Sequence, residues 1–290
     1  MKIGFIGFGE AARAFQQSLV SVRHDLTFGA YDLLFDAQGI EGACAAAARD
    51  QDVEIVHSQD LSGCDWIISA VTADQSLEAA EAASAWLRAG QIYFDINSVS
   101  PQRKRDSAAL VASAGATYLD MAVMAPVHPR GHRTPTLIAG SAPNGVTEAL
   151  GALDFNFEVV GTEPGRATAI KMVRSLFVKG MEAITVETLL AAEASGCLDY
   201  VMNSLGGSFP GLGWPDFARY QFERTLTHGK RRAAEMRESA VTMRTLGLND
   251  ALADAIADTQ DRMGALKSQA PAEDLDLGTL VRVLAPMRRS

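Results

Sequence analysis

Short apolar runs alternate with helical patterns from the start of the chain to about Gly161. Trp66–Val71 (WIISAV) is almost continuously apolar, which is typical of a strand buried on both faces of a parallel sheet. Strands of this kind joined by returning helices predict a doubly wound α/β sheet. The predicted strands are Lys2–Ile6, Leu26–Tyr31, Trp66–Val71, Gln91–Asp95, Tyr118–Val123, Thr136–Ala139 and Phe157–Val160, and the predicted helices between them are Ala11–Val22, Gln75–Leu87 and Pro101–Ala114.

The pattern changes at Gly165, after which no stretch has the character of a strand. A helical pattern without proline runs from Ala167 to Ala194, and two more cover Asp216–Leu246 and Asp250–Lys267. Gly206-Gly207 and the glycines and proline between 211 and 215 predict a loop. We therefore expect a Rossmann-type domain over residues 1–164, followed by an all-helical domain over residues 165–290 for substrate binding and dimerisation.

A glycine-rich turn follows the first predicted strand and opens the first predicted helix. Its sequence is G-x-G-x-x-A, in which the glycines permit a tight turn and a close approach to a pyrophosphate, and Ala12 keeps the helix near the sheet. A strand, turn and helix without a ligand would also fit the motif taken alone. The residues expected to contact a dinucleotide here are Gly7, Phe8, Gly9, Glu10 and Ala11.

Asp32 ends the second predicted strand, near the spacing of about 20 residues at which such folds place an acid. Its carboxylate would accept a hydrogen bond from the adenosine ribose and repel a 2′-phosphate, which favours NAD over NADP. Asp36 is the alternative acid, one turn further on, and a surface role for Asp32 is the plainer interpretation.

Two further loops follow strands that we expect to lie side by side. Ligands of open parallel sheets lie beyond the carboxyl ends of the strands, so the nicotinamide half is expected near these loops. Thr72 and Ser98 could equally be helix caps. The loop residues assigned to the cofactor are Val71, Thr72, Ala73 and Asn97, and Ser98 is assigned to the substrate.

The helix that begins the second domain carries cations on an otherwise apolar surface. Lys171, Arg174 and Ser175 share one face, and the flanking apolar positions predict a helix that is buried nearly all round. Burial beside another cation lowers the pKa of a lysine, which would let Lys171 exchange a proton near neutral pH. Pairing of Lys171 and Arg174 with acids of the first domain is the structural alternative.

Composition narrows the class of function. The chain has 290 residues, is 48% hydrophobic and has a formal net charge of −9, which argues against a general nucleic-acid or anionic-membrane binder. Its 3 cysteines are far apart and no metal-ligand spacing is visible, which is typical of a reducing compartment. With no signal peptide and no apolar run long enough for a membrane span, we expect a cytoplasmic protein without a bound metal.

Three segments together resemble the β-hydroxyacid dehydrogenase and 6-phosphogluconate dehydrogenase superfamily. They are the G-x-G-x-x-A start, Asp95–Pro101 (DINSVSP) and the lysine helix, and they cover most of the chain to about residue 195. The DINSVSP stretch resembles the family's D-x-S-T-x-x-P, which implies that Ser98 stands near nicotinamide and substrate. Lys171 resembles the family's catalytic lysine, with Gly165 before it. The resemblance implies a Rossmann domain joined to a helical domain by a long helix.

The same comparison shows departures in the substrate-binding segments. Where the family has D-x-P-V-S-G-G, this chain reads DMAVMAP, so Met124 and Ala125 replace a Ser-Gly pair. Ser175 stands where an Asn is usual, with Arg174 beside it. The family often places a second substrate lysine in a later helix, a position that His228 or Lys230 could fill. A solvated basic face is the alternative for this cluster. The cofactor fold therefore carries over, and the identity of the substrate does not.

These expectations combine into an NAD(P)-dependent oxidoreductase. It would move a hydride between nicotinamide and a substrate carbon that bears a hydroxyl or carbonyl, with Lys171 as general acid/base. An imine reductase is the enzymatic alternative, although that group usually lacks the lysine. A non-catalytic dinucleotide-binding sensor is the other. Gly180 inside an apolar helix predicts close helix packing across a two-fold interface, and hence a dimer or higher even assembly.

Overall fold

The structure is a computed structural model that describes residues 1–270 and 275–289. The described chain divides into two compact units, one from Met1 to Lys171 and one that begins at Met172. The division falls inside one long helix, shortly after the predicted boundary at residue 165.

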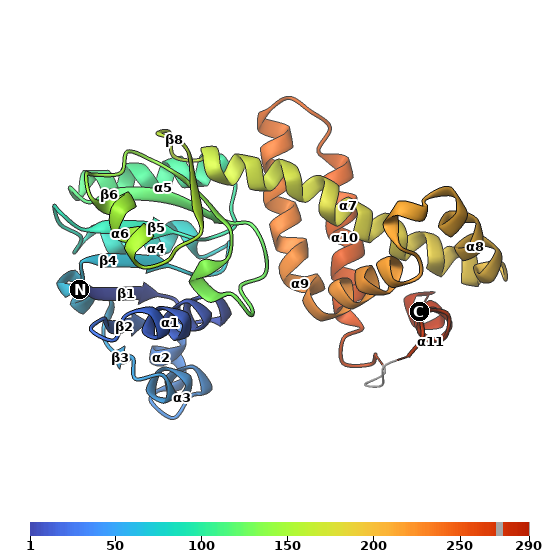
Figure 1. Cartoon of the computed structure of the whole chain (residues 1–290), viewed down its shortest axis with the longest axis horizontal. Coiled ribbons are helices and arrows are strands. Elements are labelled where there is room, and N and C mark those ends of the chain that lie inside the picture. The colour runs from blue at the N-terminus through green and yellow to red at the C-terminus, as the bar shows by residue number, and fades with distance from the viewer. Residues whose placement is uncertain (271–274, 290) are drawn as a thin grey trace. The chain divides into compact units, whose positions relative to one another are not determined.

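The first unit is built on an eight-stranded sheet with the order β3-β2-β1-β4-β5-β6-β7-β8 (Figure 1). All neighbouring strands are parallel except β6 and β7, which pair antiparallel. The strand order reverses at β1, which lies between β2 and β4, and this confirms the predicted doubly wound fold. The strands are β1 (Lys2–Ile6), β2 (Thr27–Tyr31), β3 (Glu54–Ile55), β4 (Trp66–Ser69), β5 (Ile92–Asp95), β6 (Thr117–Val123), β7 (Thr136–Ala139) and β8 (Phe157–Gly161).

Helices cover both faces of this sheet because successive strand residues point to opposite faces. Ile68 and Phe94 face the core formed with α1, α2, α3 and α6, whereas Ile67 and Tyr93 face the core formed with α4 and α5. The runs that looked continuously apolar in the sequence are thus buried on both sides. The helices are α1 (Glu10–Val22), α2 (Leu33–Gln38), α3 (Ala43–Asp50), α4 (Ser76–Ser84), α5 (Pro101–Ser113) and α6 (Val146–Ala152), with 3₁₀ turns η1 (Ser58–Gly63) and η2 (Gly131–Arg133).

The second unit is helical throughout its described residues. Its helices are the later part of α7 (Arg166–Ala194), α8 (Leu198–Ser208), α9 (Asp216–Thr245), α10 (Ala251–Ala265) and α11 (Leu277–Arg289), with the 3₁₀ turn η3 (Pro210–Leu212). The antiparallel pair α9 and α10 approaches closely at Gly229, where an added Cβ would lie 2.3 Å from the carbonyl oxygen of Gln260. Charges inside the unit are paired: the buried Glu182 carboxylate binds Arg232 and accepts from Gln260 Nε2 at 2.7 Å.

Two predictions about this region were wrong. Gly206 and Gly207 lie in the last turns of α8 and not in a loop, and the pattern predicted neither α8 nor α11. The helix α7 is also not buried all round, because Val173, Phe177 and Ile184 are 51%, 72% and 64% exposed. Apolar residues on every side of a helix indicate burial only if something covers every side, and periodicity cannot show that.

Candidate functional site

The loop after β1 is shaped by a glycine that no other residue could replace without strain. Gly7 has φ +83°, and a Cβ added there would lie 2.6 Å from the carbonyl oxygen of Ala70 at the end of β4. Its N–H donates to the carbonyl oxygen of Tyr31 at 2.8 Å. The loop is therefore held at the carboxyl ends of β1, β2 and β4, where the strand order reverses and where such sheets bind ligands.

The N-terminus of α1 faces open space. Gly9 is its N-cap, no side chain caps it, and an added Cβ at Gly9 meets nothing within 4 Å. Ala12 is fully buried against the sheet, as predicted from the motif. Backbone N–H groups at such a helix start, together with the helix dipole, bind phosphate oxygens. Glu10 is exposed and Ala11 half-buried beside this opening.

Asp32 links the glycine loop to the next helix. One carboxylate oxygen accepts from the N–H of Phe8 at 2.7 Å, and the other accepts from the N–H of Leu34 at 2.9 Å as the cap of α2. The Phe8 ring itself is fully buried in the core, so this residue can face a ligand only with its backbone. Asp36, the alternative acid, accepts from the Tyr31 hydroxyl at 2.7 Å.

Asn97 joins the ends of β4 and β5 from inside the protein. Its side chain accepts from the N–H of Val71 at 2.7 Å and donates to Ser69 Oγ at 3.0 Å, and it is only 4% exposed. Asn97 thereby fixes the loop whose residues Thr72 and Ala73 were assigned to the cofactor. Arg103 was not predicted for this place, yet its guanidinium donates to the Ala73 carbonyl at 2.6 Å. An arginine in a strongly polar helical segment gives no sequence signal for such a contact.

The predicted catalytic lysine contacts the predicted substrate serine. Lys171 Nζ donates to Ser98 Oγ at 2.5 Å, although 73 residues separate them in the chain. Both belong to the first unit, and Lys171 is half-buried. Sequence reasoning selected these two residues from separate motifs, and the structure brings them together.

A buried ionic cluster lies behind this pair. Lys104 Nζ is 2.9 Å from Asp95 Oδ1 and 3.4 Å from Asp120 Oδ1, and all three side chains are at most 1% exposed. The Tyr118 hydroxyl donates to Asp95 at 2.7 Å. Burial raises the pKa of the Asp120 carboxyl above its ordinary range, while nearby Lys104 acts in the opposite direction. Neither Lys104 nor Asp120 was predicted to belong to the site.

The remaining residues assigned to the substrate differ in their burial and in their contacts. Met124 and Ala125 are half-buried after β6, and the N–H of Met124 already donates to the Pro135 carbonyl at 2.8 Å. Met124 packs against a small cluster of buried alanines, Ala122, Ala139 and Ala167.

The candidates from residue 172 onward belong to the second unit. Arg174 is exposed, whereas buried Ser175 accepts a hydrogen bond from Lys179 Nζ at 3.1 Å. His228 is half-buried on α9. The Lys230 side chain is 66% exposed and stands 3.8 Å from Asp261, an arrangement typical of a solvated face.

Other kinds of site find little support in the described residues. His132 is buried between Ser18 and the Leu153 carbonyl, and burial lowers its pKa. Over residues 1–270 and 275–289, no group of three or more His, Cys, Asp or Glu side chains is placed to hold a metal ion. In the same residues, no helix has the length and apolar character needed to cross a membrane.

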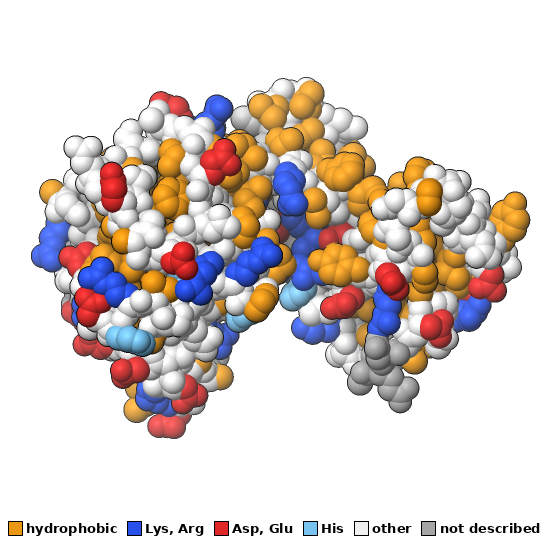
Figure 2. All heavy atoms as spheres, in the orientation of Figure 1, with side chains coloured by type: hydrophobic (Ala, Val, Ile, Leu, Met, Phe, Trp, Pro, Cys, Tyr) orange, Lys and Arg blue, Asp and Glu red, His pale blue; other side chains and the backbone are white. Residues whose placement is uncertain are grey.

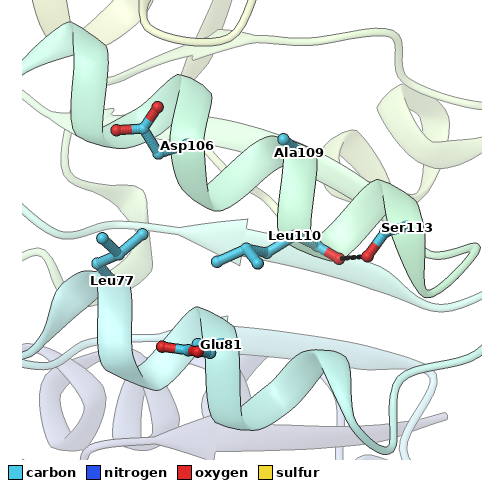
Figure 3. Close-up of a pocket in the computed structure, with 6 residues that line it drawn as sticks. All are labelled: Leu77, Glu81, Asp106, Ala109, Leu110 and Ser113. Carbon is cyan, nitrogen blue, oxygen red and sulfur yellow. Dashed lines mark hydrogen bonds between the residues drawn. The ribbon is translucent and has the colours of Figure 1, made fainter.

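A shallow groove on the outside of the first unit is separate from the predicted site. It lies between α4 and α5 (Figure 3). Its volume is about 530 Å³. None of the predicted site residues lines it. Its lining residues are Leu77, Glu81, Asp106, Ala109, Leu110 and Ser113.

Comparison with known proteins agrees with this geometry. A solved structure of a conserved hypothetical protein from Sinorhizobium meliloti 1021 is 35% identical, covers 99% of this chain and 96% of that one, and has a TM-score of 0.75. The conserved protein MTH1747, described as structurally similar to 3-hydroxyacid dehydrogenases, is 29% identical over 94% of this chain and all of its own, with a TM-score of 0.68. The chain belongs to the 3-hydroxyacid dehydrogenase family.

A family model matches part of the helical unit. Residues 192–263 match a family described as a domain of unknown function (DUF1932). The fold extends to Mycobacterium tuberculosis 3-hydroxyisobutyrate dehydrogenase, which is 16% identical, with a TM-score of 0.73 and 98% of each chain covered. Family membership supports an oxidoreductase that uses a nicotinamide dinucleotide.

Proposed function

We propose that this protein is an NAD-dependent oxidoreductase in which Lys171 is the general acid/base for a substrate that carries a hydroxyl or carbonyl group. The observation that carries the proposal is the 2.5 Å hydrogen bond between Lys171 Nζ and Ser98 Oγ. It joins a half-buried amine to the loop after β5, one of the loops at the ligand-binding edge of the sheet.

The residues at this edge fit a dinucleotide. The open N-terminus of α1 would receive the pyrophosphate, since Gly9 leaves space for it there. Asp32 would accept from the adenosine ribose, and its charge would repel a 2′-phosphate. Thr72 and Ala73 follow β4 and would line the nicotinamide half. When bound, the nicotinamide supplies the hydride chemistry.

The chain's own contribution is to hold the substrate and move a proton. The bond to Ser98 Oγ holds the Lys171 amine at the loop after β5, where the substrate oxygen would be bound. In the oxidising direction the neutral amine takes the hydroxyl proton, and in the reducing direction the ammonium returns it to the carbonyl oxygen. An amine suits this C–O chemistry, which places the proposal ahead of an imine reductase.

Lys171→Met tests the role of the amine, because methionine keeps an unbranched chain of similar length. Reduction of NAD and NADP by a panel of hydroxy acids would be followed by absorbance. Oxidation of NADH and NADPH by aldehydes and ketones would be followed in the same way. Turnover should fall by roughly 10²–10⁴, the range of positioned proton transfer. NAD affinity should stay unchanged, because the cofactor contacts come from other loops.

Lys267→Met is the matched control, since Lys267 is an exposed lysine beyond the end of α10. It should keep full activity. Near-normal turnover in Lys171→Met would show that the mechanism is wrong. NAD binding without lysine-dependent turnover of any compound in the panel would favour a dinucleotide-binding sensor.

A further inference from the structure

The start of α7 has an unusual cap. Its N-cap position is Gly165, which has φ +92° and whose added Cβ would lie 2.7 Å from the Pro101 carbonyl oxygen. A residue with a capping side chain therefore does not fit there. The cap comes instead from β6: Asp120 Oδ2 accepts from the N–H of Gly165 at 3.1 Å and from the N–H of Thr168 at 3.0 Å.

These bonds fix where α7 begins and how it is rotated. The Thr168 hydroxyl adds a bond of 2.8 Å to the carbonyl oxygen of Val99, the residue after Ser98. Lys171 follows Thr168 by three positions, which places the two on the same face of the helix. The anchored turn thus stands over the loop that carries Ser98, and Lys171 Nζ meets Ser98 Oγ from it.

The anchoring carboxylate is itself held in place. Lys104 Nζ lies 3.4 Å from its second oxygen and also donates to the main-chain carbonyl of Asp95 at 2.6 Å. Because Asp120, Asp95 and Lys104 are essentially inaccessible to solvent, the cluster has little freedom to rearrange. Removing one charge of this cluster would leave its partners buried and unpaired, which is strongly destabilising. The cluster therefore holds β5, β6 and α5 in one arrangement.

We propose that Asp120 is the positioning residue of Lys171: it caps α7 from the sheet and so sets the reach of the Lys171 amine to Ser98. This deepens the proposed function, in which Lys171 carries the proton. A misplacement of about 1 Å in such an alignment can cost on the order of 100-fold in rate.

The test reads the position of the amine and not turnover, so it can fail independently of the proposed function. The full chain is trace-labelled with acetic anhydride, and each lysine is quantified by mass spectrometry. Asp120→Val replaces the carboxylate with an apolar side chain of similar size that has no acceptor. It should raise the labelling rate of Lys171 by about fivefold or more, the factor that corresponds to the loss of about 1 kcal/mol when a buried donor is left unpaired.

Asp120→Asn retains an acceptor oxygen for the N–H groups of Gly165 and Thr168. In this variant Lys171 should be labelled at close to the wild-type rate. Lys179, Lys230 and Lys267 lie in the second unit and should label at unchanged rates in every variant, whereas general loosening of the protein would raise them as well. Thr168→Val keeps Asp120 but removes the bond to Val99, and should raise Lys171 labelling by a smaller factor.

Wild-type labelling of Lys171 in folded Asp120→Val would overturn the proposal. Should that variant not fold, unchanged Lys171 labelling in Thr168→Val would do the same. If Lys171 labelling responds as expected while Lys171→Met keeps full turnover, then Asp120 positions the amine and the acid/base role is the part that fails.

Discussion

At the scale of single residues, Asp32 has two separable duties. Its two hydrogen bonds are structural, since they hold the glycine loop and cap α2. Its negative charge is what would discriminate between cofactors.

Asp32→Asn should reduce the preference for NAD over NADP at a small cost in stability, because its amide has one acceptor oxygen for the N–H groups of Phe8 and Leu34. The amide oxygen can still accept from Leu34, but the charge-assisted bond to the ribose is lost, which is worth about 1.5–3 kcal/mol or roughly 10- to 100-fold in NAD affinity. Asp32→Ala should in addition cost about 1 kcal/mol of stability through the lost cap. Titration of both dinucleotides and urea unfolding measure these effects.

Equal affinities of the wild-type protein for NAD and NADP would contradict this assignment. So would an unchanged ratio in Asp32→Asn. In either case Asp36, held by the Tyr31 hydroxyl one turn further along, becomes the residue to vary next.

At the scale of elements, the strand–turn–helix start of the chain contains two glycines with different reasons to be glycine. Gly7→Ala forces a side chain into the left-handed region and against the backbone of β4, so it should destabilise the fold by about 1–3 kcal/mol. Gly9→Ala has open space and should change stability by no more than about 1 kcal/mol.

The same Gly9→Ala variant should weaken NAD binding on the order of tenfold, because its methyl group stands where the phosphate approaches α1. Isothermal titration with NAD and thermal unfolding separate the two effects. Full NAD affinity in Gly9→Ala would place the pyrophosphate elsewhere.

Two glycines in the helices of the second unit form a second contrasting pair. Gly180 meets only Ile256 Cδ1, at 3.5 Å, so Gly180→Ala should gain up to about 1 kcal/mol of helix propensity. At Gly229 the backbones of α9 and α10 leave no room, so Gly229→Ala should cost about 1–3 kcal/mol. Urea unfolding of both variants is the measurement, and equal effects would contradict the close approach of α9 and α10.

Gly180 also bears on the predicted assembly. Its neighbour belongs to the same chain, so a second subunit is not needed to explain this glycine. The sequence argument for a dimer through Gly180 therefore loses its basis, although the dimer itself stays a prediction.

At the scale of the whole molecule, the exposed apolar residues of α7 are a different reason to expect a dimer. Val173, Phe177 and Ile184 follow one another along one side of the helix, and Figure 2 shows hydrophobic side chains at the surface of the helical unit. Surfaces of this kind commonly mark contacts with other proteins. We expect a dimer or higher even assembly through this stripe.

Phe177→Glu should therefore shift the protein to a smaller species in light scattering at micromolar concentration. Tyr200→Glu is the matched control, because Tyr200 is 79% exposed on α8, outside the stripe. A monomeric wild-type protein would contradict the prediction, and an equal effect of both substitutions would place the interface elsewhere.

The sequence by itself determined those features whose cause is local. A strand buried on both faces must be apolar at nearly every position, and a tight turn at Gly7 needs a residue that tolerates positive φ. The doubly wound sheet, the glycine loop and the long α7 could therefore be predicted from neighbouring residues alone. Short elements such as α2 and β3 were not predicted, because a few residues show too little periodicity.

Tertiary structure alone decided which charges are inside. Lys104 stands in the polar segment PQRKRD, which by its pattern belongs on a solvated helix face, yet packing of α5 on the sheet buries it between Asp95 and Asp120. Asn97, assigned to the cofactor, turns inward for a similar reason. Partners that are distant in the chain satisfy these groups, and a pattern of hydrophobic and polar positions contains no information about such partners. The meeting of Lys171 with Ser98 is decided in the same way, by where β6 holds the start of α7.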